Sequence, residues 1–472
     1  MKIKNILIIQ ITIILLLKQT ESYSWLQKQR ITSNPIQNGN RFGFVVSTYN
    51  NEAIISAPRN NDSRGAVFLY TKDAGNNWNQ TGIITNDIYP EEIGRSLCMS
   101  EDWIFLGAPY SDDYVGVVYV YQNVSGIWTP FQNLSEQDGE YGDQFGYSVA
   151  VGGNYLAVGA KEDDQAAGLA YIFTFTGTKW NMSKKLIPPD YAPGNYFGVA
   201  VAASQNGWVF IASNCTDSCK GAVYAYKEVD GDWNYTQKIT ASDAQSNDLF
   251  GSSLAVDGDN LLIGAYGRSS KTGIVFHYVL QDDLWIQSQK IVADDAAVGD
   301  RFGKAVSIQG ALAFIGAYGY NNSAGAAYYF VLENGTWNQQ QILTASNPTP
   351  NVYFGYSSSI FAPWVFVGAF AGDQVYSFYY NGPIPPSPSP YPSPSPSPSP
   401  SPSSSPSPSP SPTTNSVKSS NLTVILVSVF IPLGVIGLVL FAILAKRRQK
   451  KKLAKIRQEI FQENSANPLG DN

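Results

Sequence analysis

Short apolar runs separated by polar turns fill most of this chain, and the pattern repeats about every 52 residues. Each copy begins with an anchor dipeptide, which is Phe-Gly in six copies and Ile-Gly in one. An alanine follows each anchor glycine by fourteen residues in all seven copies, and five of these alanines come directly after a glycine. A fixed offset in every copy predicts one structural unit used seven times. The anchors begin at Phe42, Ile93, Phe145, Phe197, Phe250, Phe302 and Phe354.

Each repeat contains four short segments with the character of β-strands. They are the anchor segment, the segment that ends in Gly-Ala, an apolar and aromatic run such as residues 116–121, and a segment that opens with tryptophan, such as residues 337–342. Turn residues separate them, as at Gly152-Gly153-Asn154. Seven sets of four antiparallel strands predict an all-β fold, a seven-bladed β-propeller. A linear solenoid is the alternative, but it would need polar caps at both ends.

The two ends of the repeat region favour a closed ring. The seventh repeat ends at Tyr380, before any tryptophan segment, and residues 25–31 near the start of the chain match the missing one. We therefore predict that residues 25–31 form the outer strand of the seventh blade. This pairing would remove two open sheet edges.

The motif resembles a known family. Phe-Gly followed by Gly-Ala-Pro, as at residues 107–109, is similar to the FG-GAP repeat of integrin α-chain heads, over about 355 residues. The resemblance implies a seven-bladed propeller in an extracellular receptor or adhesion protein. It also implies calcium loops between the first two strands of some blades, but here those connections are tight turns, as at residues 256–260, with too few oxygens for the roughly six to eight ligands of calcium. Leg domains and a Gly-Phe-Phe-Lys-Arg motif are absent too, so the sequence predicts an FG-GAP repeat membrane protein that is not an integrin.

The regions outside the repeats predict a type I single-pass membrane protein. A basic start and a short apolar run predict a signal peptide, with an uncleaved anchor as the alternative. A Ser-Pro tract predicts an extended stalk, with a ligand for proline-binding modules as the alternative. An uncharged run of 24 residues predicts a transmembrane helix, and the basic residues after it predict a cytoplasmic tail. The predicted parts are 1–24 (signal), 25–382 (propeller), 383–421 (stalk), 422–445 (membrane helix) and 446–472 (tail).

Charge and composition exclude several functions. The net charge is −6 and only 14% of residues are charged, but residues 25–382 hold 19 basic against 33 acidic residues. An acidic exterior disfavours nucleic acid, whereas the basic tail suits the anionic lipids of an inner leaflet. The single histidine, His277, excludes a multi-histidine metal site and disfavours histidine-based catalysis. We therefore expect no enzyme and no cofactor other than calcium.

One loop is a candidate cation site. Its carboxylates stand at positions 1, 3, 5 and 8, with glycines between them, and they are Glu136, Asp138, Glu140 and Asp143. The long loops of one face carry further acids, which predict either a binding face or a solvated surface. These acids are Asp112, Asp113, Glu162, Asp163, Asp164, Asp243, Asp248, Asp294, Asp295 and Asp300.

The remaining signals fit a lumenal or extracellular head. Cys215 and Cys219 predict a small-loop disulfide, whereas Cys98 is expected to be a buried free thiol. Nine Asn-X-Ser/Thr sites predict N-glycosylation. They are Asn61, Asn79, Asn123, Asn133, Asn181, Asn214, Asn234, Asn321 and Asn334.

These observations predict a cell-surface binding or adhesion protein. Its propeller would bind an extracellular protein or glycan, and it would lie in the plasma membrane, with an endomembrane location as the alternative. A structural surface coat without a dedicated ligand and an ectoenzyme are the competing functions. The ectoenzyme would need convergent acid and base groups, which the sequence does not indicate.

Overall fold

The computed structural model describes residues 23–35, 38–85, 91–136 and 138–384. Most of the predicted signal peptide, most of the stalk, the predicted membrane helix and the tail lie outside the described residues. Within them, no helix has both the length and the apolar character that crossing a membrane requires.

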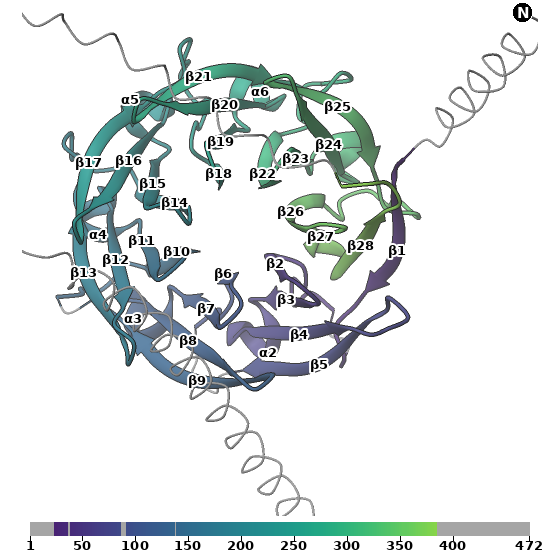
Figure 1. The fold of residues 1–472 in the computed structure, drawn as a ribbon, viewed down its shortest axis with the longest axis horizontal. Helices are drawn as coiled ribbons and strands as arrows, with labels where there is room; N and C mark the ends of the chain where they lie inside the picture. The colour runs from purple at the N-terminus through teal and green to yellow at the C-terminus, as the bar shows by residue number, and fades with distance from the viewer. Residues whose placement is uncertain (1–22, 36–37, 86–90, 137, 385–472) are drawn as a thin grey trace, which may run out of the picture. The chain divides into compact units, whose positions relative to one another are not determined.

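Seven four-stranded antiparallel sheets stand around a central opening (Figure 1), which confirms the predicted propeller. In six sheets the four strands follow chain order from the opening outward. In the seventh sheet the last three strands of the propeller follow this order, and the N-terminal strand is the outermost. Blades 1 to 3 comprise β2 (Val46–Tyr49), β3 (Glu52–Ala57), β4 (Ala66–Lys72) and β5 (Trp78–Thr85); β6 (Ser96–Met99), β7 (Trp103–Ala108), β8 (Val117–Val124) and β9 (Ile127–Leu134); and β10 (Phe145–Gly152), β11 (Tyr155–Ala160), β12 (Leu169–Phe175) and β13 (Trp180–Leu186).

The other four blades repeat this order. They comprise β14 (Phe197–Ala203), β15 (Trp208–Ser213), β16 (Ala222–Val229) and β17 (Asp232–Ile239); β18 (Ser253–Asp257), β19 (Asn260–Ala265), β20 (Ile274–Gln281) and β21 (Leu284–Ile291); β22 (Phe302–Gln309), β23 (Leu312–Ala317), β24 (Ala326–Glu333) and β25 (Thr336–Leu343); and β26 (Phe354–Phe361), β27 (Trp364–Ala369), β28 (Gln374–Tyr380) and β1 (Trp25–Ile31).

A short helical turn joins the second and third strands of every blade. In six blades its middle residues have positive φ angles, so the turn is tight and partly left-handed. We call the face that carries these turns and the connections between blades the loop face, and the opposite face the hairpin face. The turns are α2 (Asn60–Ser63), α3 (Ser111–Tyr114), α4 (Asp163–Ala166), α5 (Thr216–Cys219), α6 (Arg268–Lys271), α7 (Tyr320–Ser323) and η1 (Phe370–Gly372).

The N-terminal strand closes the ring as predicted. β1 pairs antiparallel with β28, from Trp25 opposite Tyr380 to Ile31 opposite Val375. Figure 1 shows this strand in purple beside the last, green blade. The first and last parts of the propeller therefore share one sheet, and no blade lacks an outer strand.

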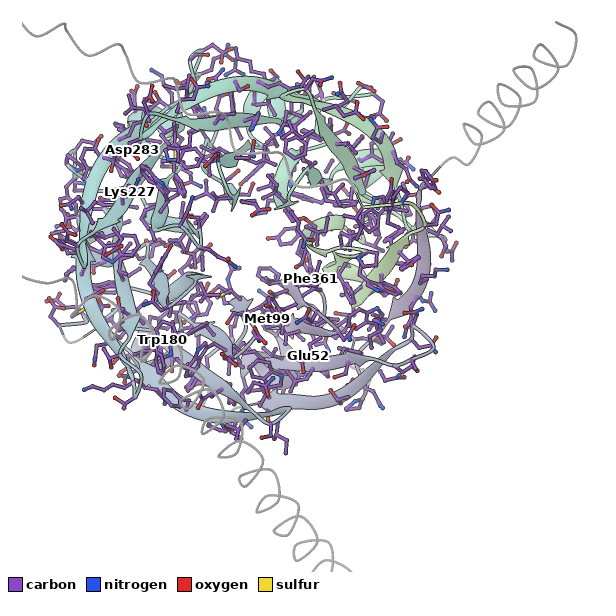
Figure 2. All side chains as sticks on the ribbon, viewed as in Figure 1. Glu52, Met99, Trp180, Lys227, Asp283 and Phe361 are labelled. Atoms are coloured by element: carbon purple, nitrogen blue, oxygen red, sulfur yellow. A yellow bond between two sulfur atoms is a disulfide. The ribbon has the colours of Figure 1, made fainter. Side chains whose placement is uncertain are left out.

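The hydrophobic core lies between neighbouring blades. Seven clusters of buried side chains each draw on two adjacent sheets, including the pair formed by the seventh and first blades. Met99 and Phe361 lie on inner strands beside the central opening, whereas Lys227 and Asp283 lie toward the outer rim, where they form an ion pair (Figure 2). Because every cluster spans a blade boundary, each blade depends on its neighbours for burial.

The glycines of the motif sit where blades approach most closely. A Cβ on Gly107, in the Gly-Ala pair of blade 2, would lie 2.0 Å from the carbonyl oxygen of Gly146, in the Phe-Gly pair of blade 3. The same approach between Gly368 and Gly43 joins blade 7 to blade 1. The two halves of the motif are therefore the two sides of one contact, which explains why both contain glycine.

Candidate functional site

The loop-face end of the central channel is lined by aromatic and cationic side chains. They come from two positions of each repeat, namely the second residue after the anchor Phe or Ile and the first residue after the conserved alanine. We call this set the mouth ring. It consists of Phe44, Arg95, Tyr147, Lys161, Tyr266, Lys304, Tyr318, Tyr356 and Phe370.

Cations in the mouth ring stack on its aromatic rings. The Arg95 guanidinium lies 4.7 Å from the ring centre of Phe44 and 4.9 Å from that of Tyr147. The Lys304 ammonium lies 5.0 Å from Tyr356 and 5.3 Å from Tyr266. Such cation–π contacts fix the long side chains without neutralising their charge.

Beneath the mouth ring lies a cavity of about 370 Å³. Five members of the mouth ring are among its lining residues, and all but the buried Phe44 are half-buried: Phe44, Arg95, Tyr147, Lys304 and Tyr356. Burial raises the pKa of Tyr356, so its phenol is neutral at physiological pH and can donate a hydrogen bond. The arrangement can hold a group that combines negative charge with a flat or apolar surface.

Sequence reasoning did not find the mouth ring, because its nine members are unlike residues drawn from two positions of the repeat. The position after the anchor glycine could have revealed it, since in five of seven repeats this residue is aromatic or basic. The acids that the sequence indicated instead lie on the same face but in its turns and loops. Asp112, Asp113, Asp164, Asp243, Asp294 and Asp295 are exposed there.

Two of the indicated acids have a structural role. Asp248 and Asp300 are buried, and each accepts a hydrogen bond from a backbone N–H three residues earlier, at Gln245 and Ala297, over 2.8 Å. They hold the loop that leads into the anchor strand. These carboxylates therefore shape the loop face rather than present charge to solvent.

The structure separates the four predicted ligands of the candidate cation loop. Glu136 and Asp143 are buried and face each other, and Asp163 from α4 joins them, so that one carboxylate oxygen of each lies within 4.8 Å of the others. Asp138 instead forms an ion pair with Lys185 over 3.0 Å, at the surface. Glu140 is exposed, and its backbone N–H donates to Asp143 over 2.6 Å. Asp163 was counted only among the loop-face acids, because it follows Asp143 by a whole hairpin.

Two of the three clustered carboxyl groups, Glu136 and Asp163, have a raised pKa. Burial raises the pKa of Glu136 to about 8, and the nearby Asp143 carboxylate adds to this, although a hydrogen bond from the Tyr171 hydroxyl opposes it. Burial also raises the pKa of Asp163 to about 6. Glu136 Oε1 is buried and has no hydrogen-bond partner among the residues that the structure describes. Ionising all three carboxyl groups in this place is therefore unfavourable unless a positive charge compensates them.

The cysteines and the single histidine have local roles. Cys215 and Cys219 are joined by a disulfide across α5. Cys98 is half-buried as a residue rather than buried, but burial of its thiol raises the pKa, so the thiol stays protonated. The His277 imidazole is buried, and its Nε2 lies 2.9 Å from Asn260 Oδ1. The side chain packs edge-on against Trp337.

None of the nine predicted glycosylation sites is buried. Asn123, Asn181 and Asn214 are half-buried, and the other six asparagines are exposed. The accessibility that glycosylation requires is therefore present at Asn61, Asn79, Asn133, Asn234, Asn321 and Asn334.

Comparison with known proteins identifies the repeat. The profile of the FG-GAP repeat family matches six segments, at residues 25–70, 128–173, 180–226, 233–276, 285–330 and 337–381. This chain belongs to the FG-GAP repeat family. Each matched segment of the FG-GAP propeller begins at a tryptophan strand, and the first begins at Trp25. The second blade, whose anchor is Ile93 rather than phenylalanine, begins between the first two matched segments.

One sequence relative and one solved structure are similar to parts of the chain. Integrin alpha-4 of Xenopus laevis is 31% identical over 127 residues, which cover 25% of the FG-GAP protein and 12% of the integrin. The match thus spans about an eighth of that relative. Among solved structures, the periplasmic gluconolactonase PpgL of Pseudomonas aeruginosa aligns with a TM-score of 0.45 at 13% identity, over 65% of this chain and 86% of that one. This likeness is too distant to bear on activity.

Proposed function

We propose that this protein is a type I single-pass cell-surface protein whose FG-GAP propeller binds an extracellular macromolecule, a protein or a glycan, through its loop face. The mouth ring carries this proposal. It places cations and aromatic rings around a cavity at the end of a rigid channel, on the face where the longest loops lie. Family membership supports a binding module, since the integrin relative shares this repeat.

The chemistry of the mouth ring indicates the kind of contact. Arg95 and Lys304 stack on aromatic rings, so an acidic group of a ligand would meet cations that are already positioned, whereas Lys161 is also ion-paired with Glu162. Aromatic faces in the same ring suit an apolar side chain or the flat face of a sugar. The exposed acids farther out would exclude strongly anionic surfaces such as nucleic acid.

Binding to the mouth ring can be tested with cells that display the full-length protein. The cells are screened against extracellular protein domains and against glycans. We expect a reproducible ligand whose binding falls at least about tenfold in the double variant Arg95→Ala, Lys304→Ala, and weakens as salt rises. The matched control is Glu101→Ala with Gln205→Ala, two exposed residues in turns of the hairpin face. A screen without any reproducible ligand would favour a surface coat, and turnover of a presented compound would favour an ectoenzyme.

The proposed topology rests on the sequence outside the described residues. Residues 1–24 would direct export, 383–421 would hold the propeller away from the membrane, 422–445 would span it, and 446–472 would contact anionic inner-leaflet lipids. The exposed Asn-X-Ser/Thr sites allow a direct test. Glycosidase treatment of the protein from intact cells should increase its electrophoretic mobility, whereas protease added outside the cells should leave the 446–472 tail intact. A tail that is cleaved from outside, or a head that carries no glycan, would contradict this topology.

A further inference from the structure

The third blade carries a carboxyl group at each of three positions that meet on the loop face. The first lies eight residues after the outer-strand tryptophan of the preceding blade, the second lies two residues before the anchor, and the third begins the short turn between strands two and three. In blade 3 these positions hold Glu136, Asp143 and Asp163. Their carboxyl groups lie within 4.8 Å of one another.

Elsewhere the first and third positions hold no acid, whereas the second is also acidic in blades 2, 5 and 6, at Glu91, Asp248 and Asp300. The first position holds Ser33, Pro188, Ala241, Ala293 and Ala345 in five other blades, and all five residues are buried. In blade 1 the three positions are Ser33, Asn40 and Asn60, and the amide of Asn40 reaches the Ser33 hydroxyl over 3.4 Å. Glu136 thus places a carboxylate where the fold otherwise accepts a small neutral residue.

Blade 5 shows how the fold compensates acids at this place. There Arg268 begins α6, where blade 3 has Asp163. Its guanidinium donates to Asp248 over 2.6 Å, and it donates to the carboxylate of Asp243 over 2.8 Å. The cationic Arg268 side chain therefore lies between the loop carboxylates of blade 5, Asp243 and Asp248.

Blade 3 has no such side chain at the equivalent position. The Lys185 ammonium forms an ion pair with Asp138 and stacks on the Tyr171 ring, whose centre is 5.4 Å away. The Tyr171 hydroxyl donates to Glu136 Oε2 and to Asp163 Oδ2. Glu136 is only 6% exposed, and its Oε1 has no hydrogen-bond partner among the described residues. An enclosed carboxylate oxygen without a donor is a vacant ligand position for a cation.

We propose that Glu136, Asp143 and Asp163 bind a divalent cation, Ca²⁺, which takes the place that the Arg268 guanidinium holds in blade 5. The donor atoms are all oxygens, which a hard cation prefers. Two ligands of one Ca²⁺ lie at most about 4.6–5.2 Å apart, because each bond is about 2.3–2.6 Å long, and the 4.8 Å limit of this cluster fits that span. Mg²⁺, with bonds of about 2.0–2.1 Å, would need the oxygens to move closer.

The proposed ion would join two loops of the same blade. Asp143 belongs to the connection that leads into β10, and Asp163 begins the turn between β11 and β12. An ion held by both would brace the loop face next to the mouth ring, because Lys161 lies two residues before Asp163. The site is not one of the tight turns on the hairpin face, where the resemblance to integrins placed calcium.

The full-length protein, freed of metal with a chelator, tests the proposal by titration with Ca²⁺ in a calorimeter and with Tb³⁺ by luminescence. Tyr171 contacts two of the three ligands, so excitation of tyrosine should sensitise Tb³⁺ emission. Added Ca²⁺ should displace Tb³⁺ and reduce this emission. We expect a site with a dissociation constant at or below ~10⁻³ M, the range of extracellular calcium modules. Saturating Ca²⁺ should also raise the melting temperature.

Two variants copy residues that other blades already hold at these positions. Glu136→Ala introduces the residue of blades 5, 6 and 7, and Asp163→Arg introduces the residue of blade 5. Each should fold, because the same fold accepts that residue elsewhere, and each should weaken Ca²⁺ binding at least about tenfold. Glu136→Gln and Asp163→Asn serve as nearly isosteric second variants if either fails to fold.

Asp138→Asn and Glu140→Gln are the matched controls, because both residues lie in the same loop but outside the cluster. They should leave Ca²⁺ affinity and Tb³⁺ emission within about twofold of the parent protein. The proposal is overturned if the parent protein binds no Ca²⁺ at several times ~10⁻³ M, in which case the cluster is neutralised by protons. It is also overturned if the controls lose binding while the Glu136 and Asp163 variants keep it.

Discussion

The side-chain amide of Gln341 brackets the backbone of Trp25, although 316 residues separate them along the chain. Gln341 Oε1 accepts from the Trp25 N–H over 2.8 Å, and its Nε2 donates to the Trp25 carbonyl over 3.0 Å. The same double hydrogen bond joins consecutive blades at four further places. These pairs are Gln29 with Trp78, Gln132 with Trp180, Gln237 with Trp285, and Gln289 with Trp337. The N-terminal strand is thus held by the contact that every one of these tryptophan strands uses.

Gln341→Ala should destabilise the propeller by about 1–3 kcal/mol, because it leaves the part-buried N–H and carbonyl of Trp25 without partners. Denaturant unfolding of the full-length protein measures the change. Gln340→Ala is the control, since this neighbouring side chain is exposed and bonds only within its own strand, so its effect should stay within about 0.5 kcal/mol. Equal effects of the two substitutions would show that the bracket does not hold the ring closed.

Trp25→Ala should cost about 3–5 kcal/mol, because this indole is 2% exposed and packs edge-on against Phe314 of the sixth blade. The adjacent residue Leu26 points outward and is 42% exposed, so Leu26→Ala should cost little. Denaturant unfolding of both variants measures the two changes in the free energy of unfolding. If Trp25→Ala unfolds like Leu26→Ala, the N-terminal strand contributes no stability to the ring.

Gly116→Ala should destabilise the protein by at least ~3 kcal/mol, well beyond the strain of a positive φ alone. Its φ angle is 98°, and a Cβ there would lie 2.1 Å from the carbonyl oxygen of Phe145 in the next blade. Gly126 has a φ of 86° but open space around it, so Gly126→Ala should cost only about 1–2 kcal/mol. The difference in stability between the two variants, measured by thermal unfolding, reports the cost of the close contact between blades at Gly116. Equal losses of stability would show that this contact is not close.

Stability should fall as the pH falls from about 6.5 to about 4, and His277 should contribute on the order of 2–3 kcal/mol of that loss. Burial lowers the pKa of His277 to about 4, so between these values the unfolded chain takes up a proton that the folded protein does not. Its contribution is complete above pH 6.5 and is lost as the pH approaches the folded value.

The measurement for His277 is a comparison of unfolding free energies for the parent protein and His277→Gln across this range. Carboxylates titrate in the same range in both proteins, so only the difference between them reports on the histidine. The glutamine amide can still pair with Asn260, which keeps the local hydrogen bond. Parallel pH profiles would contradict the prediction.

The sequence predicted the repeat, the number of blades and the closing strand because these depend on local rules. The same features recur from copy to copy: alternating strand faces, glycine at close contacts and tryptophan at a fixed offset. An assignment made in one repeat can therefore be checked against the other repeats. Trp25 could be assigned to blade 7 because its strand resembles residues 337–342. Two of four proposed ligands, Glu136 and Asp143, also came together as expected from their loop.

What the sequence could not predict is which loops meet. Asp163 lies beside Glu136 because of the left-handed turn of α4 and the path of the connection that precedes β10. No local sequence pattern determines these two features together. Asp138, which looked equivalent to its neighbours, is drawn outward by Lys185 from another strand. The mouth ring arises in the same way, since Arg95 and Phe44 belong to neighbouring blades and meet only because the two sheets pack side by side. Strand identity is set by residues near in sequence, whereas the chemistry of the loop face is set by distances across blade boundaries, which only the tertiary structure determines.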